Sequence, residues 1–120
     1  MKFPILTLLL LFAFSCDKNN PDDPTCISGD PLEEISWLKE VKENMSKRAN
    51  PTGGQIIQYT YQGECVFMID NCFGCADNLL AVYDAEQNLL CEFGGIIGLN
   101  TCPDFDKEAT NRKVIYDGTE

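Results

Sequence analysis

Apolar side chains recur along residues 31–49 at spacings of three and four, the pattern of a helix with one buried face. The helix is expected to begin after Asp30, because this carboxylate can accept hydrogen bonds from the free N–H groups of the first turn. Pro31 suits the first helical position, and the proline and glycines of residues 50–54 end the helix. Trp37 lies beside the apolar stripe and is interpreted as an edge of the core. The stripe consists of Leu32, Ile35, Leu38, Val41 and Met45.

From residue 55 the apolar period changes to two, which is typical of strands. Ile57 and Tyr59 point to one side of the first strand, and Ile56 and Gln58 point to the other. Gln62-Gly63 predicts a tight turn into the second strand. The predicted strands are residues 55–61, 65–69, 79–83, 89–93 and a short fifth strand at 113–116.

A helix followed by consecutive antiparallel strands predicts the α+β class. We expect one N-terminal helix packed on a four- to five-stranded antiparallel meander, stabilised by disulfides. The ordered domain is predicted at residues 26–117, with residues 118–120 as a tail. A core of this size is marginal by itself, so disulfides have a structural role before any chemistry is considered.

Residues 94–105 are rich in glycine and are predicted to form a long loop. The loop is not a phosphate loop, because it lacks the Gly-Lys-Ser/Thr end. Its Ile96 and Ile97 could form an exposed binding tip or a lid on the sheet. We favour the lid, because Cys102 is expected to tie the loop down.

The first 15 residues have the pattern of an export signal and are not expected to be part of the folded domain. Lys2 is followed by an apolar run at residues 5–14, which is the pattern of a secretory signal. The run is shorter than the roughly 20 residues that a membrane-spanning helix needs. Ser15 and Cys16 then resemble a bacterial lipobox, whose cysteine becomes the new N-terminus and carries diacylglycerol. We therefore expect a signal peptide at residues 1–15 and lipidation of Cys16; the alternative is an ordinary signal peptide and a disulfide-forming Cys16.

Residues 17–25 contain aspartates, asparagines and two prolines, and they predict a solvated tether between lipid and domain. Acidic residues directly behind a lipidated cysteine resemble the surface-export signal of Bacteroidetes lipoproteins, although a plain acidic linker remains the alternative. We expect a lipid-anchored protein of the cell envelope, in the outer membrane, on either its surface or its periplasmic face.

Without Cys16, an even number of cysteines remains, which in an exported chain indicates disulfides. The expected strand order places Cys26 near Cys65, and it brings Cys91 near Cys72 or Cys75. Cys102 then takes the remaining cysteine of the loop. The disulfide candidates are Cys26, Cys65, Cys72, Cys75, Cys91 and Cys102.

The C-x-x-C spacing of Cys72 and Cys75 also occurs in redox and zinc proteins. A redox thiolate usually sits at a helix N-terminus, and no helical pattern follows here. Zinc would need further thiolates or histidines at matching spacing, and the chain has no histidine. Disulfides are the preferred interpretation, with no metal and no cofactor expected.

Charge and composition exclude several function classes. The chain has 19 acidic and 9 basic residues, a formal charge of −10, and cleavage before Cys16 removes Lys2 to leave 8 − 19 = −11. Nucleic-acid binders are basic, so no nucleic-acid partner is expected. Without histidine, serine–histidine and cysteine–histidine nucleophiles are impossible within the chain.

Two arrangements of carboxylates are candidate sites. The aspartates and asparagines around residues 70–78, with Asp104 and Asp106, are possible calcium ligands, but their spacing does not match a calcium loop and a solvated loop is preferred. Glu64 and Glu92 could form an acid–base pair like that of glycosidases. We expect no enzymatic activity.

Several short motifs together resemble a family of small uncharacterised Bacteroidetes lipoproteins. They are Cys26-Ile27, Val82-Tyr83-Asp84, Leu90-Cys91, Gly94-Gly95 and Cys102-Pro103-Asp104-Phe105. The resemblance implies class and location and transfers no catalytic residue.

The expected function is that of a non-enzymatic envelope lipoprotein, attached to the membrane through its lipid, that presents a rigid domain to a protein or glycan partner. The alternatives are a thiol–disulfide or metal-handling protein that uses Cys72 and Cys75, and a small hydrolase or hydrolase inhibitor.

We predict that Cys16→Ala abolishes acylation and moves the protein from the membrane fraction to the soluble fraction. Firm attachment needs two acyl chains, and lipoprotein processing supplies at least that number on this one residue. Mass spectrometry and fractionation after a salt wash measure the change, with Cys26→Ala as the matched control that keeps its lipid. Retention of the Cys16→Ala protein by washed membranes would show that the lipoprotein interpretation is wrong.

Overall fold

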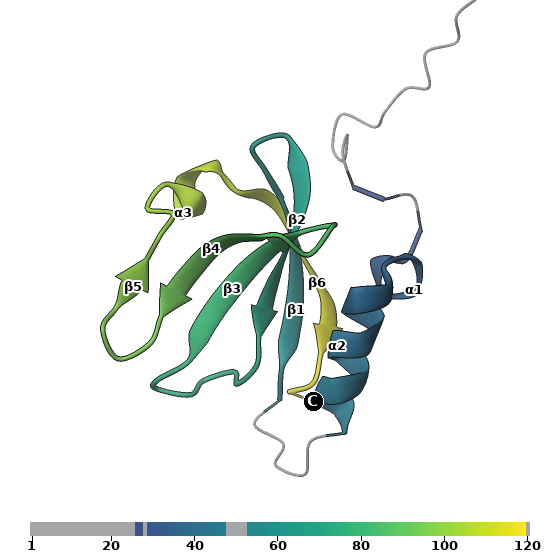
Figure 1. Cartoon of the computed structure of the whole chain (residues 1–120), viewed down its shortest axis with the longest axis horizontal. Helices are drawn as coiled ribbons and strands as arrows, with labels where there is room; N and C mark the ends of the chain where they lie inside the picture. The colour runs from purple at the N-terminus through teal and green to yellow at the C-terminus, as the bar shows by residue number, and fades with distance from the viewer. Residues whose placement is uncertain (1–25, 28, 48–52, 120) are drawn as a thin grey trace, which may run out of the picture.

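The structure, a computed structural model, describes residues 26–27, 29–47 and 53–119. The predicted signal peptide, Cys16, the tether and residues 50–52 of the predicted helix stop lie outside this part. Figure 1 shows a sheet with short helices beside it. The elements are α1 (Pro31–Glu34), α2 (Ser36–Ser46), β1 (Gln55–Tyr61), β2 (Glu64–Asp70), β3 (Leu79–Asp84), β4 (Leu89–Gly94), β5 (Leu99–Asn100), α3 (Phe105–Glu108) and β6 (Thr110–Asp117).

The sheet is antiparallel and has six strands in the order β5-β4-β3-β2-β1-β6. The predicted meander of β1 to β4 is present, but the prediction of four to five strands is wrong. β5 was missed because two residues are too few to show a period. β6 is longer than predicted and pairs with β1, and five of its eight residues in succession are exposed, which hides any alternation.

The helix begins as predicted, because the Asp30 carboxylate accepts a hydrogen bond from the Leu32 N–H at 3.0 Å and Pro31 occupies the first turn. One continuous helix was wrong, since Ile35 has an extended backbone and separates α1 from α2. With this break, Leu32, Ile35 and Leu38 are all buried. The two helices therefore supply one continuous apolar surface to the sheet.

That surface packs on one face of the sheet. Trp37 lies at its edge, as predicted, where its indole N–H donates to the Ala85 carbonyl at 2.8 Å and its ring packs edge-on against Phe67 and Tyr83. The buried residues of this first core are Leu32, Ile35, Leu38, Met45, Ile56, Cys65, Phe67 and Ile69.

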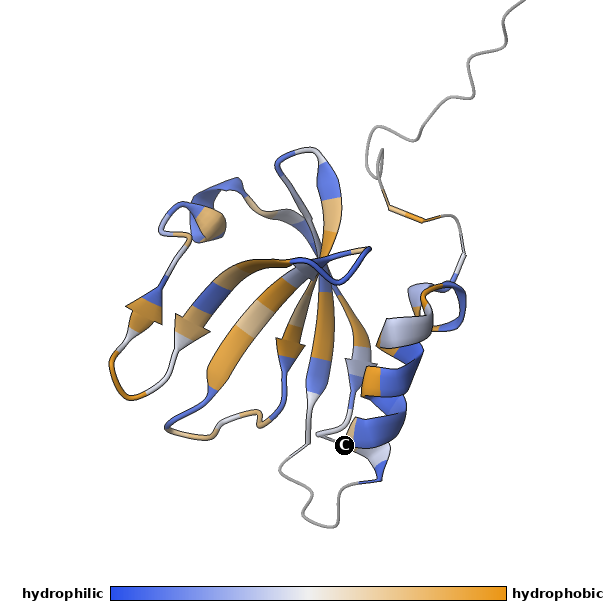
Figure 2. Ribbon diagram, in the orientation of Figure 1, coloured by the Kyte–Doolittle hydropathy of each residue, from blue (hydrophilic) through white to orange (hydrophobic). Residues whose placement is uncertain are grey.

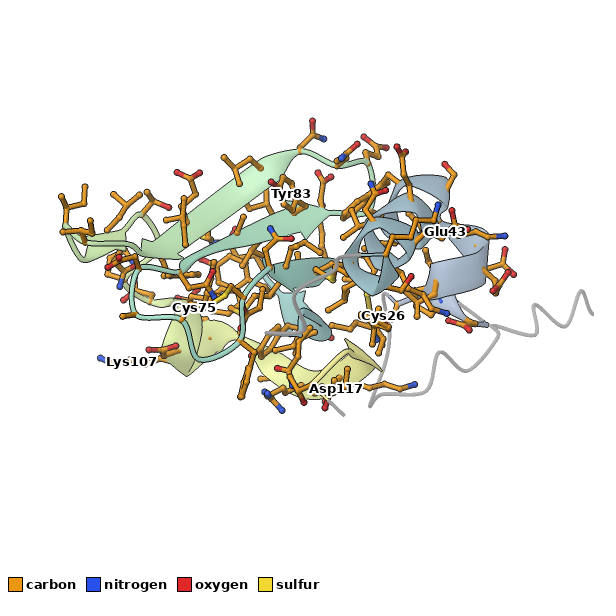
Figure 3. The ribbon with its side chains drawn as sticks, turned by 90° about the horizontal axis from the view of Figure 1, so that it is seen from below. Cys26, Glu43, Cys75, Tyr83, Lys107 and Asp117 are labelled. Atoms are coloured by element: carbon orange, nitrogen blue, oxygen red, sulfur yellow. A yellow bond between two sulfur atoms is a disulfide. The ribbon has the colours of Figure 1, made fainter. Side chains whose placement is uncertain are left out.

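A second core lies on the opposite face, which the predicted helix-on-sheet plan left open. Phe105 of α3 is only 2% exposed, and its ring lies 4.9 Å from Tyr61, 5.2 Å from Tyr59 and 5.3 Å from Phe93 between centroids. Figure 3 shows the N-terminal helices on one side of the sheet and the α3 segment, marked by Lys107, on the other. The buried residues of this core are Ile57, Tyr61, Val66, Met68, Val82, Cys91 and Phe105.

We predict that Phe105→Ala lowers the free energy of unfolding by about 3–5 kcal/mol, because it empties the centre of the second core. Denaturant unfolding measures the change. Phe73→Ala is the matched control: Phe73 is 52% exposed, and its loss should cost less than about 1 kcal/mol. Equal effects of the two substitutions would contradict the packing described here.

Candidate functional site

Large apolar side chains are exposed mainly at one end of the sheet, as the orange segments of the loops in Figure 2 indicate. Phe73 is 52% exposed, Leu79 42%, and Ile96 and Ile97 85% each. We call these four residues the apolar tip. Exposed apolar side chains that gather at one end of a folded domain are candidates for an interaction site.

Two loops that are distant in sequence build the apolar tip. Residues 71–78 join β2 to β3, and residues 95–98 join β4 to β5. The Gly95 N–H donates to the Asn78 carbonyl at 3.1 Å, and Leu79 pairs with Gly94 across the sheet. The two loops therefore lie side by side at the same end, as Figure 1 shows.

The prediction of Ile96 and Ile97 as a lid is wrong, because both project into solvent. They occupy the centre of a tight turn in which the Gly98 N–H donates to the Gly95 carbonyl at 3.3 Å. Gly95 and Gly98 have φ values of +72° and +64°, which favour glycine and let β4 turn back into β5. Phe105, rather than the isoleucines, covers the sheet on that side.

Asp70 organises the other loop from within. Its carboxylate accepts a hydrogen bond from the Cys72 N–H at 3.1 Å and another from the Asn78 side-chain amide. Asp70 is 8% exposed, so the expectation that all these carboxylates are solvated is wrong for this residue. The Phe73 N–H also donates to the Gly53 carbonyl at 3.0 Å, and these bonds fix the loop that presents Phe73.

The disulfides confirm one predicted pair and correct two. Cys26 bonds Cys65, as the strand order predicted, with 4.8 Å between their Cα atoms. The predicted bond from Cys91 to the loop cysteines is wrong, because Cys91 bonds Cys102.

The remaining pair is Cys72–Cys75, so Cys102 does not take a loop cysteine as predicted. The reason is β5, which was absent from the predicted strand order. Its hairpin returns the chain alongside β4, where the Thr101 N–H donates to the Glu92 carbonyl at 3.1 Å and Cys102 comes beside Cys91. Each loop of the apolar tip is therefore closed by its own disulfide.

An open pocket of about 380 Å³ lies next to the isoleucine turn on the face of the second core. Gly94 and Gly98, which flank this turn, form part of its wall. Side chains that line it include Met68, Leu80, Phe93, Leu99, Phe105 and Asp106. The same end of the domain thus offers both an apolar protrusion and an open depression.

The titratable groups do not converge at the apolar tip. The pKa of Asp84 is lowered chiefly by a hydrogen bond from the Asn88 side chain, and the pKa of Asp117 by one from the Thr119 side chain. Asp84 lies at the other end of β3, where it closes the turn into β4. Both carboxylates stabilise local turns.

The candidate acid–base pair, Glu64 and Glu92, is not brought together. Glu64 begins β2, whereas Glu92 pairs with Ala81, which in turn pairs with Ile69. The two glutamates are therefore two strands apart and offset by about 17 Å along the sheet.

Among the described residues, no group of three or more histidine, cysteine, aspartate or glutamate side chains is arranged to hold a metal ion. In the same part of the chain, no helix has the length and apolar character needed to cross a membrane.

The fold and the apolar tip together define a small disulfide-linked antiparallel domain that exposes two adjacent loops. Residues 41–118 match the family described as a domain of unknown function, DUF6970, and the chain belongs to this family. The matched region contains all four residues of the apolar tip. No curated protein and no solved structure matches the chain.

Sequence reasoning missed Phe73 and Leu79 as site residues. The available signal was a phenylalanine enclosed between two cysteines three residues apart, where a short closed loop leaves a large side chain little room to reach a core.

We predict that the double variant Ile96→Ser/Ile97→Ser changes the free energy of unfolding by less than about 1 kcal/mol, because solvent-exposed substitutions are close to neutral. A lid would lose roughly 1.5–3 kcal/mol for each buried isoleucine. Denaturant unfolding distinguishes the two, and a loss of several kcal/mol would show that the isoleucines are buried.

Proposed function

We propose that this protein is a non-enzymatic lipoprotein of the cell envelope that uses the apolar tip to bind a partner. In this proposal, Cys16 carries the lipid and residues 17–25 act as the tether. The lipobox-like residues, and the motifs that resemble those of small Bacteroidetes lipoproteins, support a lipoprotein of the outer membrane.

The observation that carries the proposal is the exposure of Ile96 and Ile97 at 85% on a loop closed by its own disulfide. Burying exposed apolar area on binding is favourable by about 25 cal/mol per Å². Part of this gain is normally lost to ordering flexible loops. Because Cys91–Cys102 and Cys72–Cys75 already close the two loops, less of the binding free energy is spent on ordering them.

The position of Cys26 supports display of the apolar tip. Cys26 is bonded to Cys65, which lies directly after the β1–β2 turn. The β2–β3 and β4–β5 loops lie at the other end of the strands. A tether that enters at Cys26 therefore leaves the apolar tip at the end of the domain far from its attachment.

A second candidate function, thiol–disulfide exchange, rests on the Cys72–Cys75 bond. Redox cysteines of this spacing depend on a lowered thiolate pKa, which a helix N-terminus usually provides. Residues 71–78 contain bends and turns, and none of these described residues begins a helix. The loop geometry therefore favours binding over exchange chemistry.

We predict that a photoreactive benzoylphenylalanine at position 97 of the full-length protein forms one discrete protein adduct in intact cells. The same residue at position 89 is the matched control, because Leu89 is 51% exposed but begins β4 at the opposite end of the sheet. Immunoblotting and mass spectrometry of the adducts measure the result. Ile96→Ser should remove the adduct, since it deletes half of the exposed pair.

Identical adducts at positions 97 and 89, or no adduct at position 97, would contradict a binding role for the apolar tip.

A further inference from the structure

We infer that the Cys72–Cys75 disulfide is a redox modification site that switches the apolar tip. A dithiol reduces this bond while the rest of the domain stays folded, and the reduced loop no longer holds Phe73 in place for the partner. The inference rests on the proposed binding function and deepens it by assigning its regulation. The pair is here the substrate of a reductant and not a catalyst of exchange.

The three disulfides of the described residues differ in how closely a reductant can approach them. Neither Cys72 nor Cys75 is buried. In each of the other two bonds one partner is buried, with Cys65 5% exposed and Cys91 1% exposed. Exchange begins when a thiolate attacks one sulfur of the bond, so its rate depends on access to that sulfur. The short bond is accessible at both of its sulfurs.

The sulfur that leaves also makes the short bond the easiest to reduce. Attack at Cys26 would release the thiolate of Cys65 into the first core, and attack at Cys102 would release that of Cys91 into the second core. Burial in an apolar core disfavours a charged group, so both reactions are slow. Whichever sulfur of the Cys72–Cys75 bond is attacked, the released thiolate remains in contact with solvent.

The Cys72–Cys75 bond is also the one least coupled to folding. It spans three residues, whereas Cys26–Cys65 spans 39 and Cys91–Cys102 spans 11. A disulfide that stabilises the fold is stabilised by the fold to the same extent, because the two equilibria are linked. The shortest bond gains least from this linkage and is therefore the one that a dithiol reduces most readily at equilibrium.

Hydrogen bonds on both sides of the pair keep its reduction local. The Asp70 carboxylate, at the end of β2, accepts from the Cys72 N–H and from the Asn78 side-chain amide, and so joins the two ends of the loop. The pairing of β2 with β3 involves no residue of this loop. The strands and both cores therefore need no rearrangement when the bond opens.

Phe73 lies inside the ring that the disulfide closes. The Phe73 N–H bond to the Gly53 carbonyl holds one end of this turn, and the Cys75 N–H donates to the Cys72 carbonyl at 3.1 Å. Gly74 has a φ of +79°, and glycine leaves such a conformation easily. The Phe73 side chain is 52% exposed and belongs to neither core, so the disulfide is what keeps the turn around it closed. Binding to the reduced form has to order this turn again, which lowers the affinity.

The chemical step needs a dithiol as reductant. One of its thiolates attacks a sulfur of the pair, a mixed disulfide forms, and the other sulfur of the pair leaves as a thiolate and takes up a proton. The second thiol of the reductant then attacks the mixed disulfide and releases the second cysteine as a thiol. Two electrons and two protons pass from the dithiol to the pair, and the dithiol becomes a disulfide. Exchange with a more oxidising protein disulfide reverses the step.

The first measurement uses the full-length lipidated protein, with dithiothreitol as the dithiol probe. Thiols that form are trapped by alkylation and located by mass spectrometry. We expect Cys72–Cys75 to be reduced at least about tenfold faster than either other bond, while the near-UV circular dichroism of the domain is retained. The control is the same reaction in denaturant, where burial is lost and the three rates should become similar.

The second measurement tests whether the bond acts on the partner through Phe73. In cells, Cys72→Ser/Cys75→Ser should lower the yield of the adduct from position 97 several-fold, and Phe73→Ala should lower it to a similar extent. The two changes combined should lower it little further, because they remove the same contact. Asp77→Ser is the matched control, since Asp77 is exposed in the same loop but lies outside the ring. It should leave the yield unchanged.

Three results would overturn the switch and leave the binding function standing. They are reduction of another disulfide as fast as Cys72–Cys75, loss of the near-UV signal when Cys72–Cys75 opens, and an unchanged adduct in the Cys72→Ser/Cys75→Ser protein. Additive losses from the cysteine and Phe73 changes would overturn the role given to Phe73 and, with it, the switch. Absence of the adduct when the disulfide is intact overturns the proposed function itself.

Discussion

Strand β2 is buried on both faces, and the rest of the structure depends on covering it. Residues 65–70 are all buried, with Phe67 directed to one core and Val66 and Met68 to the other. A strand in this position needs a layer of side chains on each side of the sheet. The N-terminal helices supply one layer through Leu38, and the α3 segment supplies the other through Phe105.

Because so short a chain covers both faces of the sheet, few residues are left to cover the loops at its ends. The helices and α3 are used over the middle strands, and the β2–β3 and β4–β5 loops extend beyond them (Figure 1). A small domain that cannot enclose its loops in a core can hold them by hydrogen bonds and disulfides. This chain does both, through Asp70 in one loop and the Cys91–Cys102 bond at the base of the other.

Local patterns predicted those parts of the fold in which neighbours in sequence are neighbours in space. The stripe that includes Leu38, the cap at Asp30 and the meander of β1 to β4 were of this kind. β5, α3 and the pairing of β6 with β1 were not predictable, because each is stabilised by contacts with distant residues. From sequence alone, Phe105 is predicted to lie in a glycine-rich loop, because its aromatic partners Tyr59 and Tyr61 are distant along the chain. The same holds for the apolar tip. The sequence marks Ile96 and Ile97 as candidates for a lid or an exposed tip, but the choice between the two depends on Phe105, which covers the sheet in their place.

The three disulfides differ in what they can contribute. Cys26–Cys65 closes a separation of 39 residues and Cys91–Cys102 one of 11. In the chain-entropy description, these bonds stabilise the fold by about 4 and about 3 kcal/mol. Cys72–Cys75 spans only three residues, so it restricts the unfolded chain far less. Its main effect is local, on the shape of the loop that presents Phe73. A bond that adds little to global stability but fixes an exposed aromatic residue is what the binding function proposed above would require.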